Sequence, residues 1–177
     1  MAMNEELIRA IRSVPNFPKP GIVFRDITTL LKDRSAFARA ADILYEHYKN
    51  DHIDKVVSVE SRGYILGAVL AYRLNAGFVP IRKPGKLPAE TLREEYTLEY
   101  GKDAVEMHVD AIRRGERVLL HDDLLATGGT IHAACRLVER AGGIISSVSF
   151  LIELSFLNGR KQLGNYDVFS IIRYDSE

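Results

Sequence analysis

The chain of 177 residues is long enough for one domain with a substantial buried core. Hydrophobic residues make up 46% of it and charged residues 27%, which is ordinary for a globular protein. Lysine and arginine together number 24, as do aspartate and glutamate, so the overall charge favours neither nucleic acid nor an anionic membrane as a partner, and any anion site must be local.

The first predicted element is a helix at residues 4–14, because apolar residues recur on one face and Asn4 could cap its start. Pro15 ends this pattern. The acidic start of the chain does not have the basic-then-apolar order of a signal segment, and no apolar run elsewhere approaches the length of a membrane span. We therefore expect a cytoplasmic protein.

Residues 15–28 form a proline-stiffened segment that is too irregular for a regular helix or strand. An ordered loop of this kind can wall a pocket. In such a pocket Phe24 could stack on a planar ring, while Arg25 and backbone groups around Val23 address the polar edge of that ring. The alternative is that these residues only cover the core.

A helix at residues 35–48 and a short buried strand at residues 55–59 are predicted next, from the spacing of their apolar side chains. A polar, glycine-containing turn follows the strand and leads into an amphipathic helix that ends near Leu74. In this turn Arg62 could bind phosphate oxygens through its guanidinium, while Ser61 supplies a backbone amide. Alternatively, Arg62 is a surface cap.

A strand at residues 78–82 leads into a loop that is stiffened by prolines and carries three cations, Arg82, Lys83 and Lys86. A solvated basic turn is one explanation for this cluster. A clamp for a polyphosphate leaving group is the other.

Residues 96–100 and 104–109 alternate like the two strands of a hairpin that is joined at residues 101–103. Loop and hairpin together, at residues 83–109, are inserted between parallel strands. An insertion of this kind predicts a movable lid, with Glu99 near its base.

The segment from Val118 to Thr130 organises the rest of the chain. It begins as a short apolar strand, places the carboxylates of Asp122 and Asp123 where that strand should end, and becomes small, hydroxylated and glycine-rich. The last part consists of Ala126, Thr127, Gly128, Gly129 and Thr130. Its glycines permit positive φ, its threonines can donate to phosphate oxygens, and the helix predicted at residues 131–141 would direct its first amides at the same anion. This layout predicts a phosphate cradle.

The two adjacent carboxylates would repel a phosphate unless they bind something else. They could accept hydrogen bonds from two vicinal hydroxyls of a sugar, or reach a Mg²⁺ ion through water. A ligand with both a phosphate and a ribose is implied. Alternatively, the pair only caps the following helix and the glycines only turn the chain. A Walker A motif is absent, as is a G-x-G-x-x-G run after a strand, so P-loop and dinucleotide sites lack their own motifs.

The cysteine and the histidines of the sequence do not form a pattern typical of a nucleophile or a metal site. Cys135 is the single cysteine, which rules out an internal disulfide, and its place in an apolar helical pattern favours a buried thiol over a nucleophile. The five histidines show no spacing typical of metal ligands.

Two more strands, at residues 144–153 and 168–172, complete a chain in which strands alternate with helices. We therefore predict one α/β domain over residues 1–177, built around a mainly parallel sheet. Ligands of such sheets bind beyond the carboxyl ends of the strands. The turn with Arg62, the basic loop and the phosphate cradle would all meet there.

The run from Val118 to Thr130 resembles the phosphoribosyl pyrophosphate signature of type I phosphoribosyltransferases. With four further segments the resemblance extends, over nearly the whole chain, to the adenine phosphoribosyltransferases within that family. Those segments are residues 20–27, 60–63, 81–88 and 96–101. The resemblance implies the type I phosphoribosyltransferase fold, a mainly parallel twisted sheet flanked by helices, with a lid loop or hairpin.

The resemblance also implies an activity, the transfer of the 5-phosphoribosyl group from phosphoribosyl pyrophosphate to adenine. The products would be AMP and pyrophosphate, in purine salvage, and Mg²⁺ would arrive mostly with the substrate. Members of the family are typically homodimers, in which Arg82 could reach a neighbouring active site.

By position, the resemblance assigns site residues to five groups. They are the 5-phosphate site at Ala126, Thr127, Gly128, Gly129 and Thr130; the ribose site at Asp122 and Asp123; the pyrophosphate site at Ser61, Arg62, Arg82, Lys83 and Lys86; the adenine site at Val23, Phe24 and Arg25; and the acid/base candidate Glu99. The peptide bond between Glu60 and Ser61 is expected to be cis in this family.

Two residues depart from the usual pattern of the family. His121 stands where an aliphatic residue is usual, and since its side chain should point into the sheet, we expect a hydrogen-bonded structural histidine. Glu60 replaces the commoner aspartate, which keeps the charge and lengthens the reach. Neither departure removes the expected activity.

Two other functions remain as alternatives. A regulator that senses phosphoribosyl pyrophosphate would carry an added DNA-binding domain or a basic RNA-binding face, which the zero net charge does not favour. Salvage of hypoxanthine, guanine or xanthine would be the other. Relatives with those substrates usually recognise the base near the end of the chain, whereas the base segment here is at residues 23–25.

Overall fold

The computed structural model describes residues 2–98 and 101–177 and is built on a five-stranded parallel sheet. Across the sheet the strands follow the order β4-β3-β7-β8-β9. Their bounds are β3 (Lys55–Val59), β4 (Gly77–Ile81), β7 (Arg117–Leu125), β8 (Ile144–Leu154) and β9 (Val168–Tyr174). Every neighbouring pair in this sheet is parallel, which confirms the predicted α/β fold.

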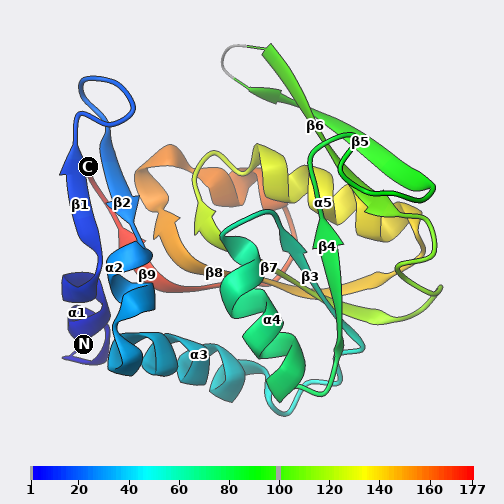
Figure 1. Cartoon of the computed structure of the whole chain (residues 1–177), viewed down its shortest axis with the longest axis horizontal. Helices are drawn as coiled ribbons and strands as arrows, with labels where there is room; N and C mark the ends of the chain where they lie inside the picture. Colours follow the sequence, from blue (N-terminus) through cyan, green and yellow to red (C-terminus); the bar gives the residue numbers. More distant parts are fainter. Residues whose placement is uncertain (1, 99–100) are drawn as a thin grey trace.

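Helices cover both faces of the sheet (Figure 1). They are α1 (Ala2–Ala10), α2 (Thr28–Lys32), α3 (Arg34–Tyr48), α4 (Gly63–Arg73) and α5 (Gly129–Arg140), with short 3-10 turns at η1 (Ser155–Leu157) and η2 (Gly159–Leu163). In the described part of the chain, no helix is both long enough and apolar enough to cross a membrane.

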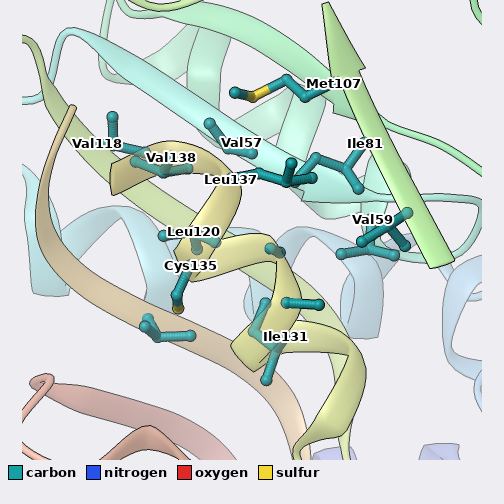
Figure 2. Packing of buried hydrophobic residues seen from close by; sticks show 14 of the residues in the cluster. Val57, Val59, Ile81, Met107, Val118, Leu120, Ile131, Cys135, Leu137 and Val138 are labelled. Carbon is teal, nitrogen blue, oxygen red and sulfur yellow. The ribbon is translucent and has the colours of Figure 1, made fainter. Parts of the chain in front are cut away.

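The buried residues of the strands alternate between two cores. Val57 and Leu120 pack with α5, whereas Val56 and Leu119 pack with the core that contains α3 and α4. Figure 2 shows the first of these cores, in which Cys135 lies among aliphatic side chains. Because both faces of the sheet are covered, its strands read as continuous apolar runs. Each fully buried valine or leucine contributes about 1.5–3 kcal/mol to stability.

The N-terminal prediction is wrong in its second half. The helix ends at Ala10, and β1 (Arg12–Pro15) follows and pairs antiparallel with β2 (Val23–Asp26). The segment predicted to be irregular therefore contains a strand. Residues 12–15 form a strand because they pair with β2 across the connecting loop. Arg12 lies opposite Asp26 in this pairing, and its Nη2 is 2.6 Å from the Asp26 carboxylate. Apolar spacing within 4–14 could not show that contact.

The predicted hairpin is present but longer than expected. β5 (Thr91–Leu98) pairs antiparallel with β6 (Gly101–His108), so the predicted turn at residues 101–103 is wrong. The first residues of β5 are polar, and this concealed the strand. Glu94 in particular is buried because Arg136 and Arg140 of α5 hold its carboxylate at 2.7 and 2.8 Å. That the loop and hairpin at residues 83–109 move as a lid stays a prediction.

Candidate active site

A cavity of about 260 Å³ opens at the carboxyl ends of β3 and β7, beside the first turn of α5. Ten of the predicted site residues line it: Ser61, Arg62, Lys83, Asp122, Asp123, Ala126, Thr127, Gly128, Gly129 and Thr130. Val23, Phe24, Arg25, Arg82 and Lys86 are not among its lining residues. Glu99 lies outside the described residues. The three segments predicted to converge at this edge thus each contribute to one pocket.

The phosphate loop takes its shape from two close backbone approaches. Gly128 has φ +89°, and a Cβ there would lie 2.6 Å from the carbonyl oxygen of Gly159. A Cβ on Gly159 would lie 2.2 Å from the carbonyl oxygen of Ala126. The loop is therefore pressed against the turn that begins at Gly159, and glycine is required on both sides of the contact. Since Gly128 is the N-cap of α5 and has no side chain, the first amides of this helix stay available to an anion.

The acidic pair lies inside β7, which continues to Leu125, and not at its end as predicted. Asp122 Oδ1 accepts from the backbone N–H of Asp123 at 2.9 Å, and Asp123 Oδ2 lies 2.8 Å from Arg62 Nε. Because the N-cap of α5 is Gly128, the alternative in which the two aspartates only cap this helix is wrong.

The same pair resists carrying two negative charges. Burial raises the pKa of Asp122 well above its usual value, and the neighbouring charge of Asp123 raises it further. Burial also raises the pKa of Asp123, although Arg62 opposes that shift. A ligand that brings hydroxyl donors or positive charge to these oxygens therefore stabilises them in their ionised form.

Arg62 connects the acidic pair to the N-terminal hairpin. Its guanidinium carbon lies 5.4 Å from the centre of the Phe24 ring, while its Nε pairs with Asp123. Phe24 in turn contacts the ring of Phe17 edge to face, with ring centres 5.2 Å apart. The predicted adenine residue Phe24 therefore lies next to the pocket through Arg62. Arg62 stands at the N-cap position of α4, as the alternative allowed, but its side chain makes no capping hydrogen bond and instead pairs with Asp123.

The three cations of the basic loop take different directions. Lys83 enters the pocket, where its Nζ donates to Tyr96 Oη at 2.9 Å and pairs with Asp103. Arg82 and Lys86 instead face Glu60, at 2.8 and 3.8 Å. Arg82 is therefore paired with a carboxylate, whereas Lys86 stays largely exposed to solvent. Although burial raises the pKa of Glu60, the Lys83 amide and the Arg82 guanidinium together hold it below its usual value.

Six lining residues of the pocket were not predicted as site residues, and two of them, Tyr96 and Glu60, are polar. Tyr96 lines the cavity and is buried, and its hydroxyl also donates to Asp103 at 3.1 Å. Glu60 lines it too, and its position between a buried strand and Ser61 was the available signal. The peptide bond between Glu60 and Ser61 is cis, as the resemblance implied.

The structural roles predicted for His121 and Cys135 are confirmed. His121 is fully buried and its Nδ1 lies 2.9 Å from Ser149 Oγ, while burial lowers its pKa to about 4. Cys135 is buried in α5, and burial raises its pKa to about 12. Neither side chain lines the pocket.

Comparison with known proteins agrees with this geometry. Residues 26–172 match the family model for the phosphoribosyl transferase domain. Curated adenine phosphoribosyltransferases from Acidobacterium capsulatum and Solibacter usitatus are 57% and 58% identical, over 96% of this chain and 94% and 98% of their own.

Solved structures give the same result. The adenine phosphoribosyltransferase of Thermoanaerobacter pseudethanolicus superposes with a TM-score of 0.94 at 54% identity, covering 97% of this chain and 99% of its own. The Saccharomyces cerevisiae enzyme, solved with adenine and an imino-altritol bisphosphate, superposes with a TM-score of 0.90 at 40% identity, covering 96% and 98%.

Proposed function

The chain belongs to the phosphoribosyltransferase family. We propose that separate groups of residues in and beside its pocket bind the 5-phosphate, the ribose, the pyrophosphate and the adenine of the reaction. The reaction transfers the 5-phosphoribosyl group from phosphoribosyl pyrophosphate to adenine and gives AMP and pyrophosphate, a step of purine salvage. The observation that carries the proposal is one pocket that a helix N-terminus, an acidic pair and two cations line together.

The 5-phosphate is bound by the loop at residues 126–130. Its glycines allow close backbone approach, and the first amides of α5 supply donors together with the partial positive charge of the helix end. The ribose hydroxyls donate to Asp122 and Asp123, which removes the cost of holding two adjacent charges in a buried place.

Pyrophosphate leaves toward the side of the pocket that Lys83 and Arg62 line. Negative charge grows on the departing oxygen, and preorganised cations stabilise it at that moment. Ser61 adds donors at the turn after β3. Arg82 and Lys86 contribute through their pairing with Glu60, which also accepts from the Lys83 backbone at 2.8 Å and so fixes the loop.

Phosphoribosyltransferases generally use Mg²⁺ with phosphoribosyl pyrophosphate, and the residues present fit an ion that arrives with the substrate. Among residues 2–98 and 101–177, no three histidine, cysteine or acidic side chains gather as metal ligands. The carboxylates that line the pocket are Asp122, Asp123 and Glu60, and Glu60 is already engaged by Arg82 and the Lys83 amide. When bound, the ion neutralises charge on the leaving pyrophosphate.

Adenine is received by β2, where Phe24 offers its ring face and the backbone around Val23 addresses the polar edge of the base. As positive charge develops on the ribose, a base nitrogen attacks the anomeric carbon, and Glu99 accepts the proton that the base loses. Closure of the hairpin over the pocket would keep water from capturing the sugar.

Pyrophosphate release tests the proposal, with adenine, hypoxanthine, guanine, xanthine or orotate offered separately beside phosphoribosyl pyrophosphate and Mg²⁺. Release with adenine alone supports the base site at β2. Release with another base contradicts that site while keeping the phosphate and ribose assignments. Binding of phosphoribosyl pyrophosphate without any release would instead support a regulator that senses this compound. The relatives that match 96% of the chain are enzymes, which disfavours that alternative.

We also propose a homodimer and a cytoplasmic location, both from the family and the sequence. Ile65 and Tyr72 on α4 and Phe78 on the adjacent strand β4 expose apolar surface at one edge of the sheet, which a second copy could cover. Light scattering at micromolar concentration tests the dimer. A mass of one chain would contradict it.

A further inference from the structure

The side chain of Arg25 does not line the pocket, to which its strand is linked through the contact of Phe24 with Arg62. Its guanidinium carbon lies 4.0 Å from the centre of the Tyr174 ring, and its Nη1 donates to Ser13 Oγ at 2.5 Å. Its Nε is buried and, within residues 2–98 and 101–177, has no hydrogen-bond partner. The aromatic face is therefore a main contact that holds this guanidinium in place.

Tyr174 is itself fixed to the central sheet. It is the last residue of β9 and lies in register with Leu154 of β8. Ser155 Oγ donates to its carbonyl oxygen at 3.0 Å, and its side chain packs against the core that contains α3 and α4. Figure 1 shows the end of β9 beside the hairpin of β1 and β2. Arg25 thus attaches this hairpin to a rigid point of the sheet.

Phe24 precedes Arg25 on β2 and points the other way, because side chains alternate along a strand. Its ring contacts Arg62, which lines the pocket. One short strand therefore presents Phe24 to Arg62, which lines the pocket, and Arg25 to Tyr174. A displacement of Arg25 moves Phe24 with it.

We infer that Tyr174 is a positioning residue for adenine. Through Arg25 it holds β2, and with it Phe24 and the backbone around Val23, where the base is received. This inference rests on the proposed adenine site at residues 23–25. It gives the C-terminal end of the chain a part in base recognition, although the base-binding segment lies near the N-terminus.

The test compares Tyr174→Leu with Tyr174→Phe, which keeps the aromatic face. Loss of that face should raise KM for adenine about three- to tenfold, the scale of a partly desolvated cation–π contact. KM for phosphoribosyl pyrophosphate should change less than twofold, and the phenylalanine variant should restore KM for adenine to near the wild-type value. The matched control is Tyr45→Leu. Tyr45 of α3 makes the same kind of contact outside the pocket, since the centre of its ring lies 4.1 Å from the guanidinium carbon of Arg73 on α4.

A double-variant cycle separates a specific effect from general loosening. If Tyr174 acts through Arg25, the combination of Arg25→Leu with Tyr174→Leu should raise KM for adenine no more than the larger single variant does. Additive increases would overturn the inference, as would equal increases in both KM values or an equal effect of the Tyr45 control. Melting temperatures of all variants identify any that fail to fold, and Tyr174→Phe remains informative in that case.

Failure of the inference is distinguishable from failure of the proposed adenine site. Phe24→Leu probes the site directly, since Phe24 is proposed to contact the base. If Phe24→Leu raises KM for adenine and Tyr174→Leu does not, the inference about Tyr174 is wrong and the site stands. If neither changes it, both are wrong.

Discussion

Replacement of Gly128 by alanine tests whether the phosphate loop depends on its contact with the turn at Gly159. The new methyl group would lie 2.6 Å from the Gly159 carbonyl oxygen and 3.1 Å from Gln162 Cβ. The first distance is too short for a carbon–oxygen contact, so the loop or the turn must shift by several tenths of an ångström. The residue also has φ +89°, which costs an alanine roughly 1–2 kcal/mol relative to its preferred conformations.

Gly115→Ala is the matched control. Gly115 has φ +87°, almost the same backbone conformation, but no atom lies within 4 Å of a Cβ placed there. It belongs to the turn before β7 and does not line the pocket. The control therefore carries the backbone cost without the clash. The difference between the two variants isolates the close contact, and we expect it to be about 1–3 kcal/mol in the free energy of unfolding.

The kinetic effect should separate the variants more clearly than stability does. Because the shift occurs where we propose that the 5-phosphate binds, we expect Gly128→Ala to raise KM for phosphoribosyl pyrophosphate about tenfold or more, since small misplacements at a site are costly. Gly115→Ala should leave both KM values near wild type. Equal destabilisation of the two variants, with KM for phosphoribosyl pyrophosphate unchanged in both, would refute the reasoning about the loop.

Three further predictions concern single side chains. Asp123→Asn should raise KM for phosphoribosyl pyrophosphate about tenfold or more and affect adenine less, because it loses charge-assisted bonds to the ribose; equal losses would count against the diol role. Glu99→Gln should lower kcat about 10²- to 10⁴-fold with small changes in KM, and an unchanged kcat would remove Glu99 from the mechanism. His121→Val should flatten the pH dependence of stability. Burial lowers the pKa of His121 to about 4 in the folded protein, below the usual 6.5, so the folded state resists protonation that the unfolded state accepts. The folded protein therefore loses stability as pH falls from 6.5 toward 4. Between pH 7.5 and 5, the free energy of unfolding of the wild type should fall about 2 kcal/mol more than that of the variant, as measured by denaturant titration.

The parallel sheet could be predicted because its strands are covered on both faces and form nearly continuous apolar runs in the sequence. For β3 the predicted and observed bounds agree at residues 55–59, and α3 begins one residue before its predicted start. The glycine-rich loop that leads into α5 was equally predictable, since its glycines, hydroxyls and following helix are consecutive in the chain. Local patterns were sufficient wherever the deciding contacts are local or face a continuous apolar core.

Contacts between distant segments account for the errors. The strand at residues 12–15 exists because Arg12 pairs with Asp26 across a loop, and the start of β5 is held by arginines of α5 that follow more than forty residues later. The direction of Arg25 was missed for a related reason. Once residues 23–26 are known to form a strand, alternation separates Phe24 from Arg25, but the irregular loop predicted there gave no such rule.

Arg62 shows how the three parts of the site depend on one another. It follows β3, yet its guanidinium reaches Asp123 of β7 and the ring of Phe24 on β2, residues ninety-nine positions apart in the chain. The resemblance placed it with the pyrophosphate, and the pocket is consistent with a cation there. Its contacts add that the same charge balances the buried acidic pair before substrate binds. If ribose hydroxyls donate to the Asp123 oxygens in place of Arg62, N–H groups of the Arg62 guanidinium would become available to the leaving pyrophosphate. Binding of the sugar and stabilisation of the leaving group would then both depend on Arg62.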